Sequence, residues 1–120
     1  MAESHSLGQL GENLAAQFLL DEGYKILNRN WKSGKHEIDI IAENKEFIVF
    51  VEVKTRTTNY QLHPRDAVTT PKQRSIIFAA DNYINWNYIT KESRFDIITV
   101  VSDGKSHEIE HIENAFYPTL

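Results

Sequence analysis

The chain of 120 residues contains no cysteine, one methionine, three prolines and no apolar run long enough to cross a membrane. Without cysteine it has neither a disulfide framework nor a thiolate metal site, which is typical of proteins in a reducing cytoplasm. The first residues, Met1-Ala2-Glu3-Ser4-His5-Ser6, lack the basic and apolar segments of an export signal. We therefore expect a cytoplasmic protein without a membrane association.

Internal repeats, low-complexity segments, a glycine-rich phosphate loop and a Ser-His-Asp constellation are also absent from the sequence. Hydrophobic residues make up 41% of the chain, which is enough for a core. A chain of this length can bury roughly two-thirds of its unfolded surface. We predict one domain that spans residues 1–120.

Ionisable residues stand inside two otherwise apolar, β-branched runs. Asp39 lies in Glu37-Ile38-Asp39-Ile40-Ile41, and Glu52 and Lys54 lie in Phe50-Val51-Glu52-Val53-Lys54. Such groups are rarely buried without a partner, a metal or a catalytic task. Two carboxylates from neighbouring strands suit Mg²⁺, which completes its shell with water and phosphate oxygens. The pattern predicts a metal-dependent phosphodiesterase site, and an ion pair of Lys54 with a carboxylate is the alternative.

Strand periodicity predicts how these residues meet. Alternate side chains share a face of a strand, so Glu52 and Lys54 point the same way. The short polar connection Glu43-Asn44-Lys45-Glu46 predicts an antiparallel hairpin, in which Asp39 lies across from the end of its partner strand. The second strand is apolar on both faces, which is typical of a central strand.

A first helix is expected from a capping-box pattern at Ser6-Leu7-Gly8-Gln9 to Gly23, followed by an edge strand over residues 24–30. Glu12 lies four residues before Ala16 and seven before Leu19, so it is expected at the rim of the buried side. A glutamate that only favours the helix dipole is the alternative for Glu12.

A second helix is expected from Thr70 as N-cap, with Pro71 at its first position, to about Trp86. Lys72 and Arg74 lie in its first turn, where the helix dipole disfavours cations. A nearby phosphate would resolve this conflict, because amides at a helix start bind anions. The turn is a candidate clamp on a nucleic-acid backbone, and two solvated charges are the alternative.

Two further strands are expected over residues 95–101 and 106–112, joined by the turn Ser102-Asp103-Gly104-Lys105. They should complete a mixed sheet of four or five strands. Arg94 and Asp96 are interpreted as a structural salt bridge, with pairing to site residues as the alternative.

Histidines and large aromatic residues give weaker signals. His107 and His111 share a strand face but are too far apart for one metal, so we expect them on the surface. Trp31, Tyr60 and Trp86 could stack on unpaired bases, although partial burial in the core is the more common role of such residues.

The net charge of −4 argues against indiscriminate DNA coating, which relies on lysine and arginine. The distribution of charge is uneven, because residues 54–74 carry a net charge of 5 − 1 = +4. A basic patch beside acidic metal ligands is what a phosphate-cleaving site needs, and a solvated charged loop is the alternative. The basic residues are Lys54, Arg56, Arg65, Lys72 and Arg74, and the acidic one is Asp66.

The order of these residues resembles a known superfamily. The chain is similar to the YraN-like family of small bacterial proteins, within the restriction-endonuclease-like superfamily of PD-(D/E)xK nucleases. The layout is also similar to that of archaeal Holliday-junction resolvases. The matching segments are Gly11-Glu12, Gly23-Tyr24, Glu37-Ile38-Asp39-Ile40-Ile41-Ala42, Val49-Phe50-Val51-Glu52-Val53-Lys54-Thr55-Arg56, Arg94-Phe95-Asp96 and Asn114-Ala115-Phe116.

The resemblance implies roles for individual residues. Asp39 and Glu52, with a main-chain carbonyl near Val53, would hold Mg²⁺ or Mn²⁺, and Lys54 would be the catalytic lysine. Glu12 would bind a second ion or orient the first shell, and Gln73 would steer the substrate. Substrate-binding roles are expected for Arg56, Lys72 and Arg74.

The sequence departs from the family pattern in two places. Lys35-His36 stand between Gly34 and Glu37, where many relatives have glycine directly before the glutamate, and Tyr60-Gln61-Leu62-His63-Pro64 lacks an expected glycine. Neither departure touches an expected metal ligand, but the second changes the loop expected over the site.

We therefore expect an α/β restriction-endonuclease-like fold, a mixed sheet flanked by helices, that cleaves DNA, with branched DNA as one candidate substrate. A symmetric resolvase would be a two-fold dimer, with the helices or Ala115-Phe116-Tyr117-Pro118 at the interface. One alternative is a non-catalytic nucleic-acid-binding or assembly module that retains the fold. Another is a subunit whose nuclease action requires a protein partner.

Overall fold

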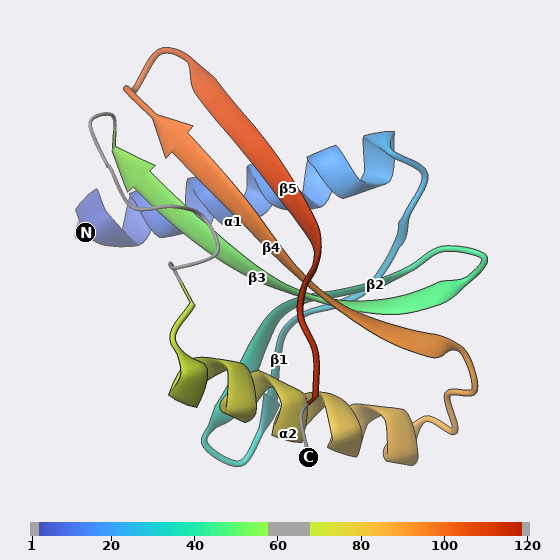
Figure 1. Ribbon diagram of the computed structural model, residues 1–120. Coiled ribbons are helices and arrows are strands. Elements are labelled where there is room, and N and C mark those ends of the chain that lie inside the picture. Colours follow the sequence, from blue (N-terminus) through green and yellow to red (C-terminus); the bar gives the residue numbers. More distant parts are fainter. Residues whose placement is uncertain (1–2, 58–67, 119–120) are drawn as a thin grey trace.

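The computed structural model describes residues 3–57 and 68–118, with the side chains of residues 3–6 excepted. Two helices and five strands alternate along the chain (Figure 1). They are α1 (Glu3–Asp21), β1 (Lys25–Ser33), β2 (His36–Glu43), β3 (Phe47–Thr57), α2 (Thr70–Trp86), β4 (Glu92–Ser102) and β5 (His107–Phe116).

All five strands form one sheet in the order β1-β2-β3-β4-β5. Neighbouring strands are antiparallel except β3 and β4, which run parallel and are connected through α2. The predicted hairpin and the central position of β3 are confirmed. The α/β fold with a mixed sheet and flanking helices is confirmed as well, and it is consistent with the restriction-endonuclease-like architecture.

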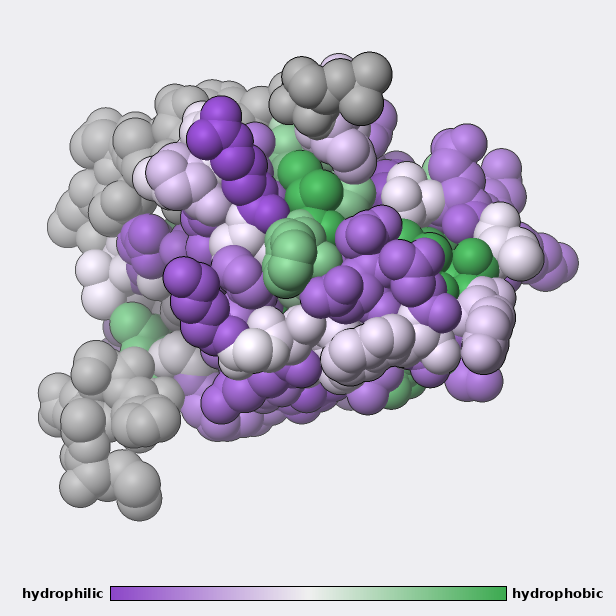
Figure 2. Space-filling model, turned by 90° about the horizontal axis from the view of Figure 1, so that it is seen from below, coloured by the Kyte–Doolittle hydropathy of each residue, from purple (hydrophilic) through white to green (hydrophobic). Residues whose placement is uncertain are grey.

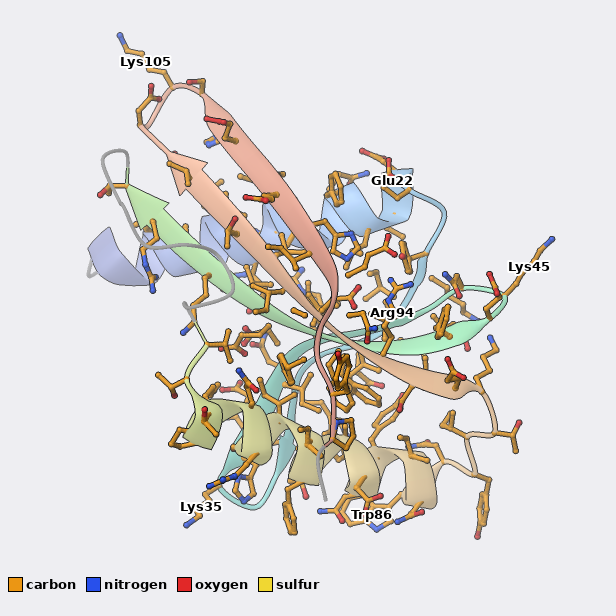
Figure 3. The ribbon with its side chains drawn as sticks, in the orientation of Figure 1. Glu22, Lys35, Lys45, Trp86, Arg94 and Lys105 are labelled. Carbon is orange, nitrogen blue, oxygen red and sulfur yellow. The ribbon has the colours of Figure 1, made fainter. Side chains whose placement is uncertain are left out.

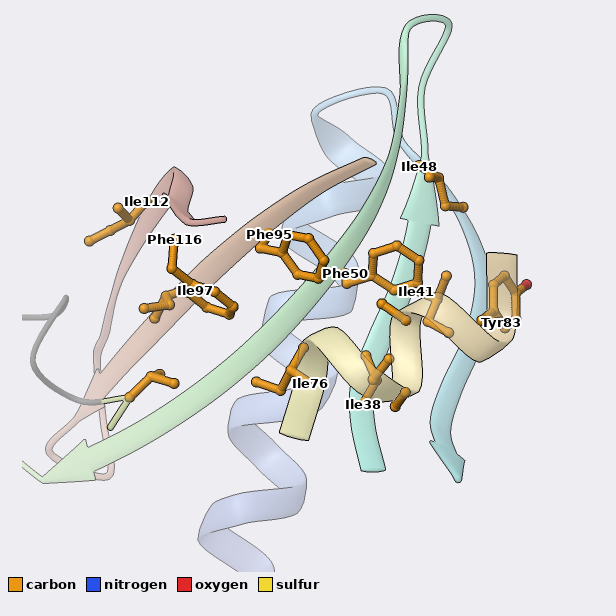
Figure 4. Packing of buried hydrophobic residues seen from close by; sticks show 13 residues of the cluster. Ile38, Ile41, Ile48, Phe50, Ile76, Tyr83, Phe95, Ile97, Ile112 and Phe116 are labelled. Atoms are coloured by element: carbon orange, nitrogen blue, oxygen red, sulfur yellow. The ribbon is translucent and has the colours of Figure 1, made fainter. Parts of the chain in front are cut away.

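The two helices cover opposite faces of the sheet (Figure 1). Under α1, Ala15, Ala16 and Leu19 pack on one set of strand residues, which includes Val49 and Val51. Under α2, Figure 4 shows the larger cluster on the other face, built around stacked aromatic rings. Its largest members are Phe50, Phe95, Phe116, Tyr83, Ile38, Ile41, Ile48, Ile76, Ile97 and Ile112. Consecutive residues of β3 therefore enter different cores, which explains why the strand is apolar on both faces.

Both helix starts differ from the sequence prediction. Helix α1 begins at Glu3, before the expected capping box at Ser6. The N-cap of α2 is Thr69, whose hydroxyl accepts a hydrogen bond from the Lys72 amide at 3.4 Å, and Thr70 is the first helical residue. Two adjacent threonines offer the same hydroxyl, so the sequence alone did not select between them. The expected ends hold, because α1 stops before Gly23, which has a φ of 93°, and α2 stops at Trp86.

Two of the three hairpin turns of the sheet, those between β2 and β3 and between β4 and β5, are closed by a side-chain acceptor. The Oδ1 atom of Asn44 accepts from the amides of Glu46 and Phe47, and that of Asp103 accepts from the amides of Lys105 and Ser106. Strand β5 runs on to Phe116, past the predicted end at Ile112.

A buried ionic network lies between β4, β5 and the end of α1 (Figure 3, Arg94). Asp96 is fully buried and is bonded by Arg94 at 2.8 Å, by His111 at 2.7 Å and by the amide of Asn114 at 2.9 Å. Arg94 also donates to the Tyr24 hydroxyl at 2.6 Å. The structural salt bridge is confirmed. The prediction that His111 lies on the surface is wrong, because its side chain is bonded to the buried Asp96. The spacing of the histidines in the sequence does not indicate a partner on a neighbouring strand.

Replacing Asp96 by asparagine is expected to destabilise the protein by about 3 to 5 kcal/mol, because the buried Arg94 would keep only the exposed Glu113, at 3.5 Å, as a counter-ion. Burial alone would raise the pKa of Asp96, but the bonds from His111, Arg94 and Asn114 lower it below the ordinary value. The stabilisation is therefore present at neutral pH and is lost as the pH falls below about 4. Urea unfolding across this pH range checks both effects. Asp21→Asn, at an exposed position, is the control, and equal stability of the two variants would contradict the assignment.

Trp31 is half-buried and makes edge-to-face contacts with Tyr83 and Trp86, so partial burial rather than a free stacking surface describes it. Trp86 is exposed at the end of α2, and Tyr60 lies outside the described residues. None of the helices in the described part of the chain has the length and apolar character needed to cross a membrane.

Candidate functional site

The central sheet divides between β2 and β3. Pairing of these strands runs from Glu43 and Ile48 to Ile40 and Val51 and ends there. Beyond this point β2 stays paired with β1, and β3 continues along β4 (Figure 1). We call the point where β2 and β3 separate, after the pair Ile40 and Val51, the fork. At the fork, the Oδ2 atom of Asp39 accepts a hydrogen bond from the amide of Val53 at 2.8 Å. Asp39 thus lies beside Val53, where the pairing of β2 with β3 ends, and not across from the predicted end of the partner strand, because β3 continues to Thr57.

Glu52 follows directly after Val51, the last residue of β3 that pairs with β2, and is only 4% exposed. Its Oε2 atom lies 3.6 Å from the Lys54 ammonium nitrogen, which shares its strand face as predicted. The ammonium nitrogen of Lys72, from the first turn of α2, lies 3.8 Å from the same oxygen. Residues from β2, β3 and α2 therefore meet at the fork.

The electrostatics of Glu52 are unusual for a carboxylate. Burial, followed by the nearby charge of Asp39, raises the pKa of Glu52 from 4.5 to about 8, although Lys72 and Lys54 act in the opposite direction. The other oxygen, Oε1, is buried without a hydrogen-bond partner among the described residues. Two close carboxylates with one bare oxygen need additional positive charge when both are ionised.

Glu12 enters the same region from α1. Its Oε1 atom accepts from Arg29 at 3.0 Å and from the side-chain amide of Asn30 at 2.8 Å, both on β1. Asn30 has a φ of 51°, a conformation in which non-glycine residues are uncommon. The edge strand therefore holds Glu12 in place at the fork. Neither Arg29 nor Asn30 was identified from the sequence, because nothing in a polar edge strand marks which residue faces a helix.

An open cleft of about 550 Å³ lies beside the fork. It contains Glu12, Asp39, Lys54 and Arg56, together with residues that were not predicted. The unpredicted lining consists of Leu7, Gly8, Gln9, Asn30 and Thr55, and Val53 lines the cleft as well. The structure thus brings four of the predicted residues to one cleft. The carboxylate of Glu52 contacts the ammonium group of Lys54, which lines the cleft, and also that of Lys72.

Two predicted residues are not among those that line this cleft. The side-chain nitrogen of Gln73 donates to the Val68 carbonyl at 3.1 Å, where it closes the start of α2. Arg74 lines a separate groove with Ile77 and Phe78. Arg65, Asp66 and the loop Tyr60-Gln61-Leu62-His63-Pro64 lie outside the described residues.

Helix α1 packs closely on β3 at Gly11, next to Glu12. A Cβ atom at Gly11 would overlap the Thr55 side chain, so only glycine fits without a shift. Gly11→Ala is expected to destabilise the protein by about 1 to 3 kcal/mol and to move Glu12 outward. Thermal unfolding measures the effect.

The matched control is Gly8→Ala in the same helix, where a Cβ meets nothing within 4 Å. Alanine favours a helix over glycine by about 1 kcal/mol, so this variant is expected to gain stability. A gain at Gly11 as well would contradict the close contact with Thr55.

Among residues 3–57 and 68–118, no group of three or more histidine, aspartate or glutamate side chains forms a ready metal site. Asp39 and Glu52 form a pair instead, with the main chain of Val53 beside them. Mg²⁺ usually takes only one or two carboxylates and keeps several waters, so a pair is sufficient for this class of ion.

Comparisons with known proteins give a consistent result. The sequence model described as "Uncharacterised protein family UPF0102" matches residues 11–100. A UPF0102 protein of Phocaeicola vulgatus is 46% identical over 120 residues, which cover 100% of this chain and 99% of the relative. A UPF0102 protein of Flavobacterium psychrophilum is 44% identical over 98% of this chain and 98% of the relative. One of Porphyromonas gingivalis is 43% identical over 97% of this chain and 87% of the relative. Their names state no activity.

Proposed function

Because the chain belongs to the uncharacterised protein family UPF0102, we propose a function from the site itself, namely metal-dependent hydrolysis of DNA phosphodiester bonds. The observation that carries the proposal is the bare, buried Oε1 atom of Glu52 beside Asp39 at the fork of the sheet. A purely structural carboxylate would have its oxygens bonded, as Asp96 has.

The residues at the fork fit a hard divalent cation. Asp39 and Glu52 supply carboxylate oxygens, and the residue after Glu52, Val53, supplies a main-chain carbonyl oxygen. Oxygen donors of this kind suit Mg²⁺ and Mn²⁺, and the bare Oε1 atom is free to accept one. When bound, such an ion lowers the pKa of a water ligand and neutralises phosphate charge.

The other residues have separate tasks in the proposed reaction. Lys54 lines the cleft and its ammonium group contacts Glu52. In this position the ammonium group orients the attacking water or offsets charge on the phosphate oxygens. Arg56 lines the same cleft and Lys72 contacts Glu52 from the start of α2, so both favour an anionic backbone despite the net charge of −4. Glu12, fixed by Arg29 and Asn30, orients the ligands from the opposite wall.

The proposal is tested with labelled linear, flapped and four-way DNA in Mg²⁺, Mn²⁺ or chelator. The wild type is expected to cleave at least one of these in the metal-containing reactions only. Lys54→Ala should lower the rate by about a hundredfold or more. The matched control is Lys45→Ala, at the exposed turn between β2 and β3 (Figure 3).

Other outcomes point to the alternatives. Retention of branched DNA without cleavage and without any need for metal would favour a non-catalytic binding module. Metal binding without cleavage by the isolated chain would favour a subunit that requires a protein partner. Cleavage that persists at the wild-type rate in Lys54→Ala would assign the activity to another site or to a contaminant.

A further inference from the structure

A second exposed surface lies along α2, where the helix borders β4 and Pro118. It combines a groove of about 480 Å³ with the outward side of the helix, and we call it the α2 face. Figure 2 looks at the molecule from this side and shows hydrophobic atoms in a recess that hydrophilic atoms surround. The α2 face comprises Arg74, Ile77, Phe78, Asp81 and Ile84, with Phe95 and Pro118 at the edge of the groove.

Phe78 is the largest apolar residue on the α2 face and is 55% exposed. Ile77 and Ile84, seven residues apart, are only partly buried against the core. Large apolar groups that gather on one exposed helix side are typical of an interaction surface rather than of a solvated one.

Two opposite charges stand on the same helix row as this apolar patch. Arg74 and Asp81 are exposed and are separated by seven residues, which is two turns or about 10.5 Å. Neither has an ion-pair or hydrogen-bond partner in the described part of the chain. The midpoint between them falls between Ile77 and Phe78.

We propose that the α2 face binds the α2 face of a second copy of this chain, with the two helices antiparallel about a two-fold axis near Ile77 and Phe78. In such a pairing Arg74 of each copy meets Asp81 of the other, so two ion pairs flank an apolar centre. A two-fold interface requires a surface that complements itself, and a row of cation, apolar residues and anion does so.

The size of the surface predicts the strength of the dimer. Helix α2 has 17 residues and is about 25 Å long, so one helix pair with its groove is at the low end of specific interfaces. We therefore expect a micromolar dissociation constant. The first turns of the two helices, each with Lys72 beside Glu52, would lie about 20 Å apart at opposite ends of the pair.

This inference does not depend on the proposed hydrolysis, and its test uses no nucleic acid. Sedimentation equilibrium of the full chain measures the dissociation constant in the micromolar to millimolar range. Arg74→Asp and Asp81→Arg are each expected to raise this constant by more than about tenfold, because like charges then face each other. The double variant with both changes should return to within about threefold of the wild type.

Matched charge reversals at Glu22→Arg and Lys105→Asp, which lie away from α2 in Figure 3, should leave the constant unchanged. Arg74 is exposed and makes no ion pair within the described residues, so Arg74→Asp is expected to keep the wild-type unfolding temperature, which thermal unfolding of the same preparation checks. A wild type that is monomeric at millimolar concentration would overturn the proposal. A dimer that tolerates both single reversals would also overturn it, since another face would then form the contact.

Discussion

Asp39→Asn is expected to lower the rate of metal-dependent DNA cleavage by more than about a hundredfold while leaving the fold intact. The asparagine oxygen can still accept the hydrogen bond from the Val53 amide that joins β2 and β3 at the fork. The substitution therefore removes a negative charge and a metal ligand but retains the local structure. Single-turnover cleavage and thermal unfolding, measured on the same preparation, separate these effects.

The control for this variant is Asp103→Asn in the exposed turn between β4 and β5. The side-chain oxygen of asparagine can accept the hydrogen bonds from the two backbone amides of that turn, as that of aspartate does. Wild-type cleavage by Asp39→Asn would refute the assigned site, whereas a large fall in its unfolding temperature would reveal a structural role for the charge itself.

Glu52→Gln is expected to make the metal-free protein more stable at pH 8 by about 2 kcal/mol, although it removes the central ligand. Burial and the charge of Asp39 raise the pKa of Glu52 to about 8, against 4.5 for an ordinary glutamate. Between these values the folded protein holds a proton that the unfolded chain releases, so wild-type stability falls as the pH rises. Glutamine stays neutral, which removes this cost.

Two comparisons check the sign of this prediction. The gain should be large at pH 8 and should nearly vanish at pH 5, where the wild-type carboxyl is protonated in the folded state. Mn²⁺ should raise the unfolding temperature of the wild type but not of Glu52→Gln, because a ligand stabilises only the state that binds it. Glu108→Gln, on the exposed side of β5, is the control for the loss of one acidic group. A less stable Glu52→Gln at pH 8 would mean that the ion pairs with Lys54 and Lys72 outweigh the burial cost.

Local patterns were sufficient to predict the elements that build the site. The apolar runs around Asp39 and Glu52 specified two neighbouring strands, and their polar connection specified the hairpin. Alternation along β3 then placed Glu52 and Lys54 on one face, as found. These features depend on contacts between near neighbours in the sequence, and their periodicity is visible without a structure.

Contacts between distant segments could not be predicted in the same way. The cations in the first turn of α2 suggested a phosphate, but Lys72 has a protein partner in Glu52 on β3. His111 was expected on the surface but contacts Asp96 on the neighbouring strand. The attachment of Glu12 to Arg29 and Asn30 likewise depends on how α1 crosses the edge strand, which no local pattern contains.

The most direct test of the proposed function is whether the fork binds a divalent ion at all. Electron paramagnetic resonance of Mn²⁺, titrated with the wild type and with Asp39→Asn, counts bound ions without any need for a DNA substrate. We predict at least one ion bound per wild-type chain and a loss of affinity of about tenfold or more in Asp39→Asn. If the wild type bound no Mn²⁺, or the variant bound it equally well, the assignment of Asp39 and Glu52 as a metal-dependent site would be wrong.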